Sequence, residues 1–133
     1  MTMAEMRTNS FINGEWVGSS SQIDVLNPAT GKSLASVANA SIADCLRAVD
    51  VAAEAFDAWK NTAPRVRGEI LRKAFEIMMA EQEQLARLIT LEMGKILADS
   101  RAEVAYAAEF FRWFSEEAVR IDGDYRRAPG GAN

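Results

Sequence analysis

The sequence contains no histidine and a single cysteine, Cys45, among its 133 residues. Without histidine it has no Ser-His or Cys-His nucleophile pair and no imidazole ligand for zinc. One cysteine cannot form an internal disulfide, so we expect a reducing, cytoplasmic compartment. Because no histidine or second cysteine could activate it, Cys45 is expected to be a small core or boundary residue rather than a nucleophile.

Long apolar runs, a positive charge excess and phosphate-binding loops are also missing. No run approaches the ~18 apolar residues that a membrane helix needs, and residues 1–10 lack the apolar segment of a secretory signal. The net charge of −4 argues against a nucleic-acid partner. Neither the G-x-G-x-x-G nor the Walker A pattern occurs. We therefore expect that this stretch alone carries no complete active site and no metal site, and that it makes no membrane contact.

What is present is the composition of a globular protein, with 49% hydrophobic and 26% charged residues. Two β-hairpins are predicted first. Asn13 and Gly14 stand between two short apolar runs, which is the strongest local signal for a two-residue hairpin turn. Pro28 and Gly31 then predict a turn between strands at 23–26 and 32–37.

From Ser41 onward the apolar period changes from two to about 3.6. Ser41 is a good N-cap, and Asp44 follows at nearly the spacing of a capping box. Gly94 is placed to end a helix as a C′ glycine. The pattern predicts helices at about 42–60, 64–80, 82–93 and 97–120. The stripe of the first helix consists of Ile42, Leu46, Val49, Ala53 and Phe56.

The last predicted helix carries the aromatic run Phe-Phe-Arg-Trp-Phe at 110–114, which surrounds more than half of its circumference. A helix that is apolar on several sides is normally buried between layers or meets a partner. The alternative is that the aromatic side chains line a ligand channel. We expect its buried side to contain Leu97, Val104, Ala108, Phe111, Phe114 or Ser115, and Ala118.

Four short segments in succession resemble the N-terminal part of the aldehyde dehydrogenase superfamily. They are Phe-Ile-Asn-Gly-Glu-Trp at 11–16, Asn-Pro-Ala-Thr-Gly at 27–31, Ala-Phe-Asp-Ala-Trp at 55–59 and Thr-Leu-Glu-Met-Gly-Lys at 90–95. Residues 110–118 and 120–124 are most similar to the succinate-semialdehyde dehydrogenase branch. The resemblance runs from about residue 9 to residue 133 and covers roughly the first quarter of a family member.

The resemblance implies an α/β fold with a Rossmann-type cofactor domain. This chain alone is then an α+β fragment of two N-terminal β-hairpins followed by about four helices. Residues 1–133 would be the incomplete N-terminal part of the cofactor-binding domain. Residues 121–133 would begin the strand that joins subunits, which implies a homo-oligomer.

The resemblance also implies an activity. Family members oxidise an aldehyde to a carboxylic acid with NAD or NADP, through a thioester on a cysteine. In the family the nucleophile, the base glutamate and the cofactor glycines all lie further along the chain. The fragment is therefore expected to be catalytically silent and to bind neither dinucleotide alone. Only Phe111, Trp113 and Phe114 are expected near a substrate channel.

The residues allow three alternative interpretations. Glu92, within Leu-Glu-Met-Gly-Lys at 91–95, looks like a shortened copy of the family's base motif, but its place before the aromatic helix favours a helix-end role. An intact enzyme could use Glu103 and Glu109, yet six residues span about 600° of helix rotation and place them on different faces. A self-standing helical interaction or oligomerisation module would end on a satisfied element, unlike Ala-Pro-Gly-Gly-Ala-Asn at 128–133.

If the fragment interpretation holds, the helices lack the sheet that they would cover. Apolar surface at 42–59, 66–89 and 97–118 should then be exposed, which favours association of the chain with itself.

Overall fold

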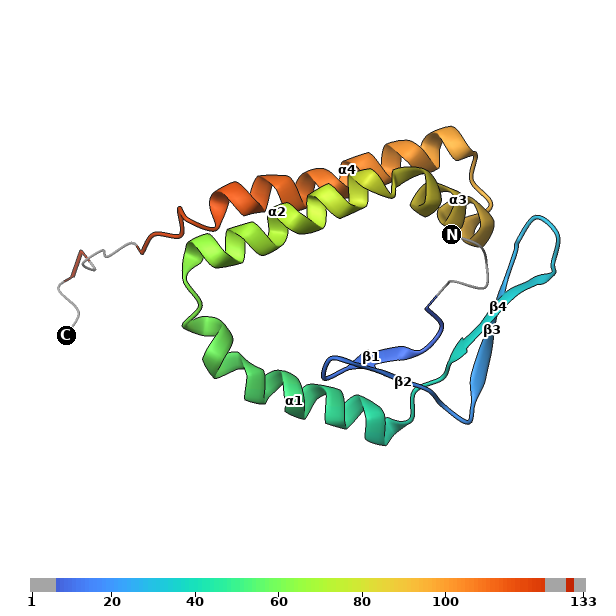
Figure 1. Ribbon diagram of the computed structural model, residues 1–133, viewed down its shortest axis with the longest axis horizontal. Coiled ribbons are helices and arrows are strands. Elements are labelled where there is room, and N and C mark those ends of the chain that lie inside the picture. The colour runs from blue at the N-terminus through green and yellow to red at the C-terminus, as the bar shows by residue number, and fades with distance from the viewer. Residues whose placement is uncertain (1–6, 124–128, 131–133) are drawn as a thin grey trace.

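The computed structural model describes residues 7–123 and 129–130, and within these it has two antiparallel β-hairpins followed by four helices (Figure 1). This confirms the expected α+β arrangement. The elements are β1 Ser10–Ile12, β2 Glu15–Val17, β3 Gln22–Leu26, β4 Ser33–Ala38, α1 Ile42–Lys60, α2 Pro64–Ala80, α3 Gln82–Met93 and α4 Leu97–Glu117.

Both hairpin turns follow their local sequence. Asn13 and Gly14 have φ values of 53° and 80°, which a type I′ turn requires at both central positions. Beside this turn, Phe11 pairs with Trp16 in the β1–β2 register. In the β3–β4 turn, the Gly31 N–H donates to the Asn27 carbonyl at 2.8 Å, and Gly31 has a φ of 68°.

The helix ends also follow the sequence. The Asp44 N–H donates to Ser41 Oγ at 3.1 Å, and the Ser41 N–H donates to the Asp44 carboxylate at 3.1 Å, so a complete capping box starts α1. Gly94 ends α3 in the left-handed conformation, with a φ of 75°. Helix α4 ends at Glu117, three residues before the predicted Arg120.

The core lies where α2, α3 and α4 pack together, and it is built from small residues. Gly68 of α2 lies so close to α4 that an added Cβ would be 2.7 Å from the Ser115 carbonyl oxygen. Ser100 of α4 is fully buried, and its hydroxyl lies 2.9 Å from that of Thr90 on α3. Small side chains let the helix backbones approach closely. The other buried residues of this core are Ala86, Val104, Ala108 and Ala118, the last of which is the C-cap of α4.

The predicted buried side of α4 is only partly correct. Val104, Ala108 and Ala118 are buried, whereas Phe111 and Phe114 are 37% and 54% exposed. The expectation for Phe111 was wrong, and of the two alternatives Phe114 and Ser115 it is Ser115 that is half-buried, as Leu97 is. The close helix packing accommodates small side chains and leaves both aromatic rings outside it.

Helix α1 lies apart from α2 and α4, across the frame that the chain forms (Figure 1), and none of its residues is buried. The expected exposure of apolar surface is therefore confirmed for this helix. The placement of Cys45 was wrong, because it is exposed on α1 rather than in a core or at its boundary. The residues of the exposed stripe are Ile42, Leu46, Val49, Ala53 and Phe56.

The predicted subunit-joining strand at 121–133 falls largely outside the described residues. Positions 121–123 and 129–130 are described, and none of these five is in a strand.

Candidate functional site

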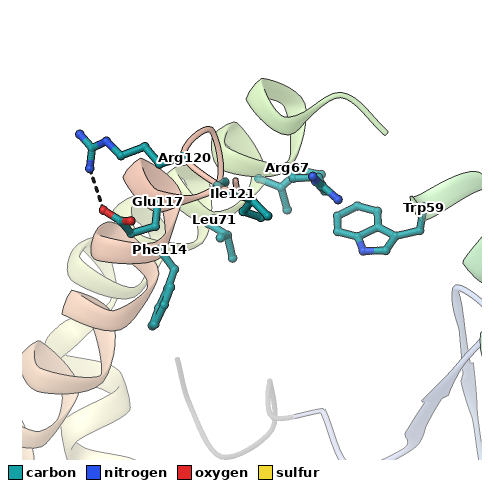
Figure 2. Close-up of a pocket in the computed structure, with 9 residues that line it drawn as sticks. Trp59, Arg67, Leu71, Phe114, Glu117, Arg120 and Ile121 are labelled. Atoms are coloured by element: carbon teal, nitrogen blue, oxygen red, sulfur yellow. Dashed lines mark hydrogen bonds and ion pairs between the residues drawn. The ribbon is translucent and has the colours of Figure 1, made fainter. Parts of the chain in front are cut away.

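A cavity of about 540 Å³ opens between the C-terminal end of α1, the start of α2 and the end of α4 (Figure 2). Trp59 reaches toward Arg67 from α1, and Phe114 and Ile121 come from the other side. The residues that line it are Trp59, Arg67, Ile70, Leu71, Phe114, Glu117, Ala118, Arg120 and Ile121. These nine side chains include no hydroxyl, thiol or amine, and the carboxylate among them, that of Glu117, forms an ion pair with Arg120.

Three of the side chains that line this cavity are charged, those of Arg67, Glu117 and Arg120. Arg120 Nη1 donates to the Glu117 carboxylate at 2.7 Å, as the dashed line in Figure 2 marks. Arg67 adds a second guanidinium to the lining of this cavity. The Arg120 charge is paired with Glu117, so a ligand with an apolar body and an anionic end would meet the Arg67 guanidinium in this lining.

A second hollow of about 350 Å³ follows the aromatic face of α4. The Tyr106 and Phe110 rings meet edge to face, with centroids 5.0 Å apart. Phe114 borders both hollows and Trp113 borders the second, whereas Phe111 is not among the residues that line either. The structure thus brings two of the three residues predicted for a substrate channel to one hollow, and their role in such a channel stays a prediction.

The carboxylates of the intact-enzyme alternative are both paired with cations. Glu103 forms an ion pair with Lys95. The Glu109 carboxylate accepts a hydrogen bond from Arg112 Nε at 2.7 Å, and this bond lowers the pKa of Glu109. A general acid at neutral pH needs a raised pKa. The arrangement therefore contradicts a general-acid role for Glu109.

The shortened motif at 91–95 lies at a junction in the fold. Glu92 is exposed on α3, two residues before the left-handed Gly94. A Cβ on Gly94 would lie 3.0 Å from Pro28 Cγ in the β3–β4 turn. Two of the segments that carry the family resemblance thus touch each other, although they are more than 60 residues apart in the sequence.

The starts of α1 and α2 do not have the arrangement that binds a dinucleotide phosphate. Such a site uses free N–H groups at a helix start after a glycine-rich turn. The Asp44 N–H at the start of α1 already bonds to Ser41, and Pro64, which has no N–H, begins α2.

Two other features are absent from the described positions. Over residues 7–123 and 129–130, no group of three or more acidic, cysteine or histidine side chains could hold a metal ion. No helix in this part of the chain has the length and apolar character needed to cross a membrane.

Sequence reasoning missed the cavity at Trp59 altogether. Trp59 belongs to the Ala-Phe-Asp-Ala-Trp segment, and Ile121 follows the aromatic helix, so both lie in segments that carried the family resemblance. Trp59 and Ile121 are far apart in the sequence, and contacts between such residues depend on how the helices pack. The sequence pattern therefore did not indicate that both would line one cavity.

The profile of the aldehyde dehydrogenase family matches residues 16–132. A succinate-semialdehyde dehydrogenase of Paenarthrobacter nicotinovorans is 54% identical over 100 residues, which cover 75% of this chain and 22% of that protein. A glutarate-semialdehyde dehydrogenase of Pseudomonas putida is 44% identical over 120 residues, which cover 89% of this chain and 25% of that protein. The chain thus spans about a quarter of the length of these relatives.

Solved structures agree with the sequence relatives. A betaine aldehyde dehydrogenase from Staphylococcus aureus, crystallised in complex with NAD+, superimposes with a TM-score of 0.90 at 29% identity. That match covers 97% of this chain and 27% of the other. The fold, the family profile and the relatives confirm the resemblance noted in the sequence, and this chain belongs to the aldehyde dehydrogenase family.

Proposed function

We propose that the chain forms the N-terminal part of the cofactor-binding domain of an NAD(P)-dependent aldehyde dehydrogenase that oxidises succinate semialdehyde. The 54% identity to a succinate-semialdehyde dehydrogenase carries this proposal. The glutarate-semialdehyde relative supports the same substrate class, because both aldehydes named carry a carboxylate at the far end. Guanidinium groups such as that of Arg67 would suit this anionic end.

The proposed reaction needs three parts that the described residues do not supply. A cysteine thiolate attacks the aldehyde, a nicotinamide accepts the hydride, and a base helps water to hydrolyse the thioester. Cys45 is exposed, and it is not among the residues that line either α4 hollow. We therefore propose that the 133-residue chain is catalytically silent by itself.

Two further properties follow from the family resemblance. The enzyme would be a homo-oligomer joined in part through residues 121–133, and it would work in the cytoplasm, where a free thiol such as that of Cys45 stays reduced.

The test is a chimera in which this chain replaces the matching N-terminal quarter of the Paenarthrobacter enzyme. With succinate semialdehyde, we expect the chimera to form NADH or NADPH and the isolated chain to form neither. A folded, inactive chimera would contradict the proposed role. The isolated chain could instead show turnover that the substitution Cys45→Ala abolishes. That result would overturn the proposal that the chemistry belongs to residues outside this chain.

The chimera also tests the predicted channel. Phe111→Ala, Trp113→Ala and Phe114→Ala should raise the KM for succinate semialdehyde. Phe56→Ala is the matched control, because Phe56 on α1 is 58% exposed, close to the values for Trp113 and Phe114. Equal KM values for all four variants would remove the channel role from α4.

A further inference from the structure

The turn of the β1–β2 hairpin places an asparagine directly before a glycine. Asn13 and Gly14 are both exposed at this turn. A Cβ added to Gly14 would have no atom within 4 Å apart from its chain neighbours, so other elements of the described chain do not crowd this residue. Asparagine is chemically labile, and glycine has no side chain that would hinder approach to its own nitrogen. The Gly14 backbone nitrogen can therefore reach the side-chain amide carbon of Asn13 once the turn opens.

Four other asparagines in the described part of the chain lack this arrangement. They are Asn9, Asn27, Asn39 and Asn61, and the residues that follow them are Ser10, Pro28, Ala40 and Thr62. Serine, alanine and threonine have a Cβ beside the backbone nitrogen, and proline has no N–H. The side-chain amides of Asn39 and Asn61 also donate hydrogen bonds, which restrain both groups. Of these five asparagines, Asn13 thus has the least hindered neighbouring nitrogen.

The β1–β2 hairpin is also short enough to open. Its strands have three residues each, and within the described residues they pair only with each other. A two-stranded hairpin of this kind is marginally stable in water. Local opening frees the backbone angles of the turn, which the paired strands otherwise fix. The open hairpin therefore allows the Asn13 side chain to turn toward the Gly14 nitrogen.

We propose that Asn13 is a site of spontaneous chemical modification, at which the asparagine becomes isoaspartate. The Gly14 nitrogen bonds to Asn13 Cγ, and the bond from Cγ to Nδ2 breaks, so that Nδ2 leaves as ammonia with the Gly14 amide proton. Water then opens the resulting succinimide ring. Breaking the ring bond to Cγ gives aspartate, and breaking the ring bond to the main-chain carbonyl carbon gives isoaspartate. The reaction needs only water, and it does not depend on the proposed enzymatic activity.

Isoaspartate would release the hairpin from α1. The main chain then passes through the side chain of residue 13, which adds one atom to a two-residue turn. Turn type and loop length fix the register of a hairpin, so the pairing of Phe11 with Trp16 would be lost. Ile12 is 7% exposed, and together with the turn and side chains of α1 it lines a hollow of about 300 Å³. We therefore expect the modified hairpin to leave this hollow and to expose Ile12.

Incubation of the purified 133-residue chain at neutral and at mildly alkaline pH tests the modification. Peptide mass spectrometry measures the conversion of Asn13, with Asn39 and Asn61 as internal controls in the same sample. We expect Asn13 to gain one mass unit several-fold faster than either control, and faster at the higher pH, because the backbone nitrogen attacks after losing its proton. A methyltransferase specific for isoaspartate identifies the product. Equal rates at the three asparagines, no conversion of Asn13, or aspartate as the sole product would overturn the proposal.

Hydrogen exchange tests the release of the hairpin. The backbone amides of β1 and β2 should lose protection in proportion to the isoaspartate content of the incubated chain. Asn13→Gly keeps a residue suited to positive φ and removes the reactive amide, whereas Asn13→Asp adds the charge without lengthening the main chain. We expect incubated Asn13→Gly and fresh Asn13→Asp to keep their protection. Full protection in the isoaspartate-containing chain, or an equal loss in Asn13→Asp, would contradict release by the longer main chain.

Discussion

The group of α2, α3 and α4 and the single helix α1 are both amphipathic, yet they differ in burial. The three helices bury small residues such as Ala86 and Ala108 against one another. Helix α1 exposes its large apolar side chains and buries none of its residues. The difference shows that an apolar stripe on a helix does not by itself determine whether that helix packs against another element of the chain. Close packing within this chain depends on where small residues let two backbones approach.

The largest expected loss of stability comes from forcing α2 and α4 apart where their backbones are close together. Gly68→Val would bring a Cβ within 2.7 Å of the Ser115 carbonyl oxygen, so one helix must shift. We expect a loss of about 3 kcal/mol in the free energy of unfolding, measured with urea. Gly123→Val is the matched control, because no atom lies within 4 Å of the added Cβ. Similar losses for both variants would show that helix packing does not cause the effect.

A pair of valine substitutions compares the two regions directly. Val104 is 3% exposed on α4, and Val49 is 65% exposed on α1. We expect Val104→Ala to cost about 2 kcal/mol, because it leaves a cavity in the core. Val49→Ala should change stability by less than about 0.5 kcal/mol. The free energy of unfolding is measured at protein concentrations where the chain is monomeric, and equal costs would contradict the comparison.

A smaller effect is expected from the ion pair that joins α3 to α4. Arg101 donates from Nε and Nη2 to Glu83 at 2.7 and 3.0 Å. These bonds, with a further one from Arg87, lower the pKa of Glu83 from 4.5 to about 2. Because the pKa is lower in the folded chain, the pair stabilises the fold above about pH 4.5. This stabilisation is lost as the pH falls toward 2.

Unfolding measured between pH 5 and pH 2 tests this pair. Glu83→Gln should reduce the dependence of stability on pH over that window, while Glu54→Gln on α1 serves as the exposed control. The effect should be modest because both partners are about half exposed. An unchanged pH dependence in Glu83→Gln would show that the pair does not stabilise the contact between α3 and α4.

Local structure was largely predictable from the sequence. The Asn13-Gly14 turn, the Ser41–Asp44 capping box and the Gly94 helix end all depend on a few neighbouring residues. Such features reflect allowed backbone angles and short hydrogen bonds, which do not require knowledge of the rest of the fold.

Contacts between helices were less predictable. Gly68 and Ser100 interrupt apolar patterns, yet both are buried at contacts where a larger side chain would not fit or would lose a hydrogen bond. Phe114 has a strongly apolar side chain, yet it lines an open hollow. Hydropathy ranks residues by polarity, whereas these positions are decided by size and by the geometry of the neighbouring helix.

The contact between Gly94 and Pro28 has a mechanical consequence. The first part of the chain is connected to the three helices covalently at residues 61–63 and touches them again where Pro28 meets Gly94. A contact so far along the sequence from the α1–α2 connection closes the chain into a ring. A side chain at position 94 would push against Pro28, and the β3–β4 turn would then have to move away from the end of α3.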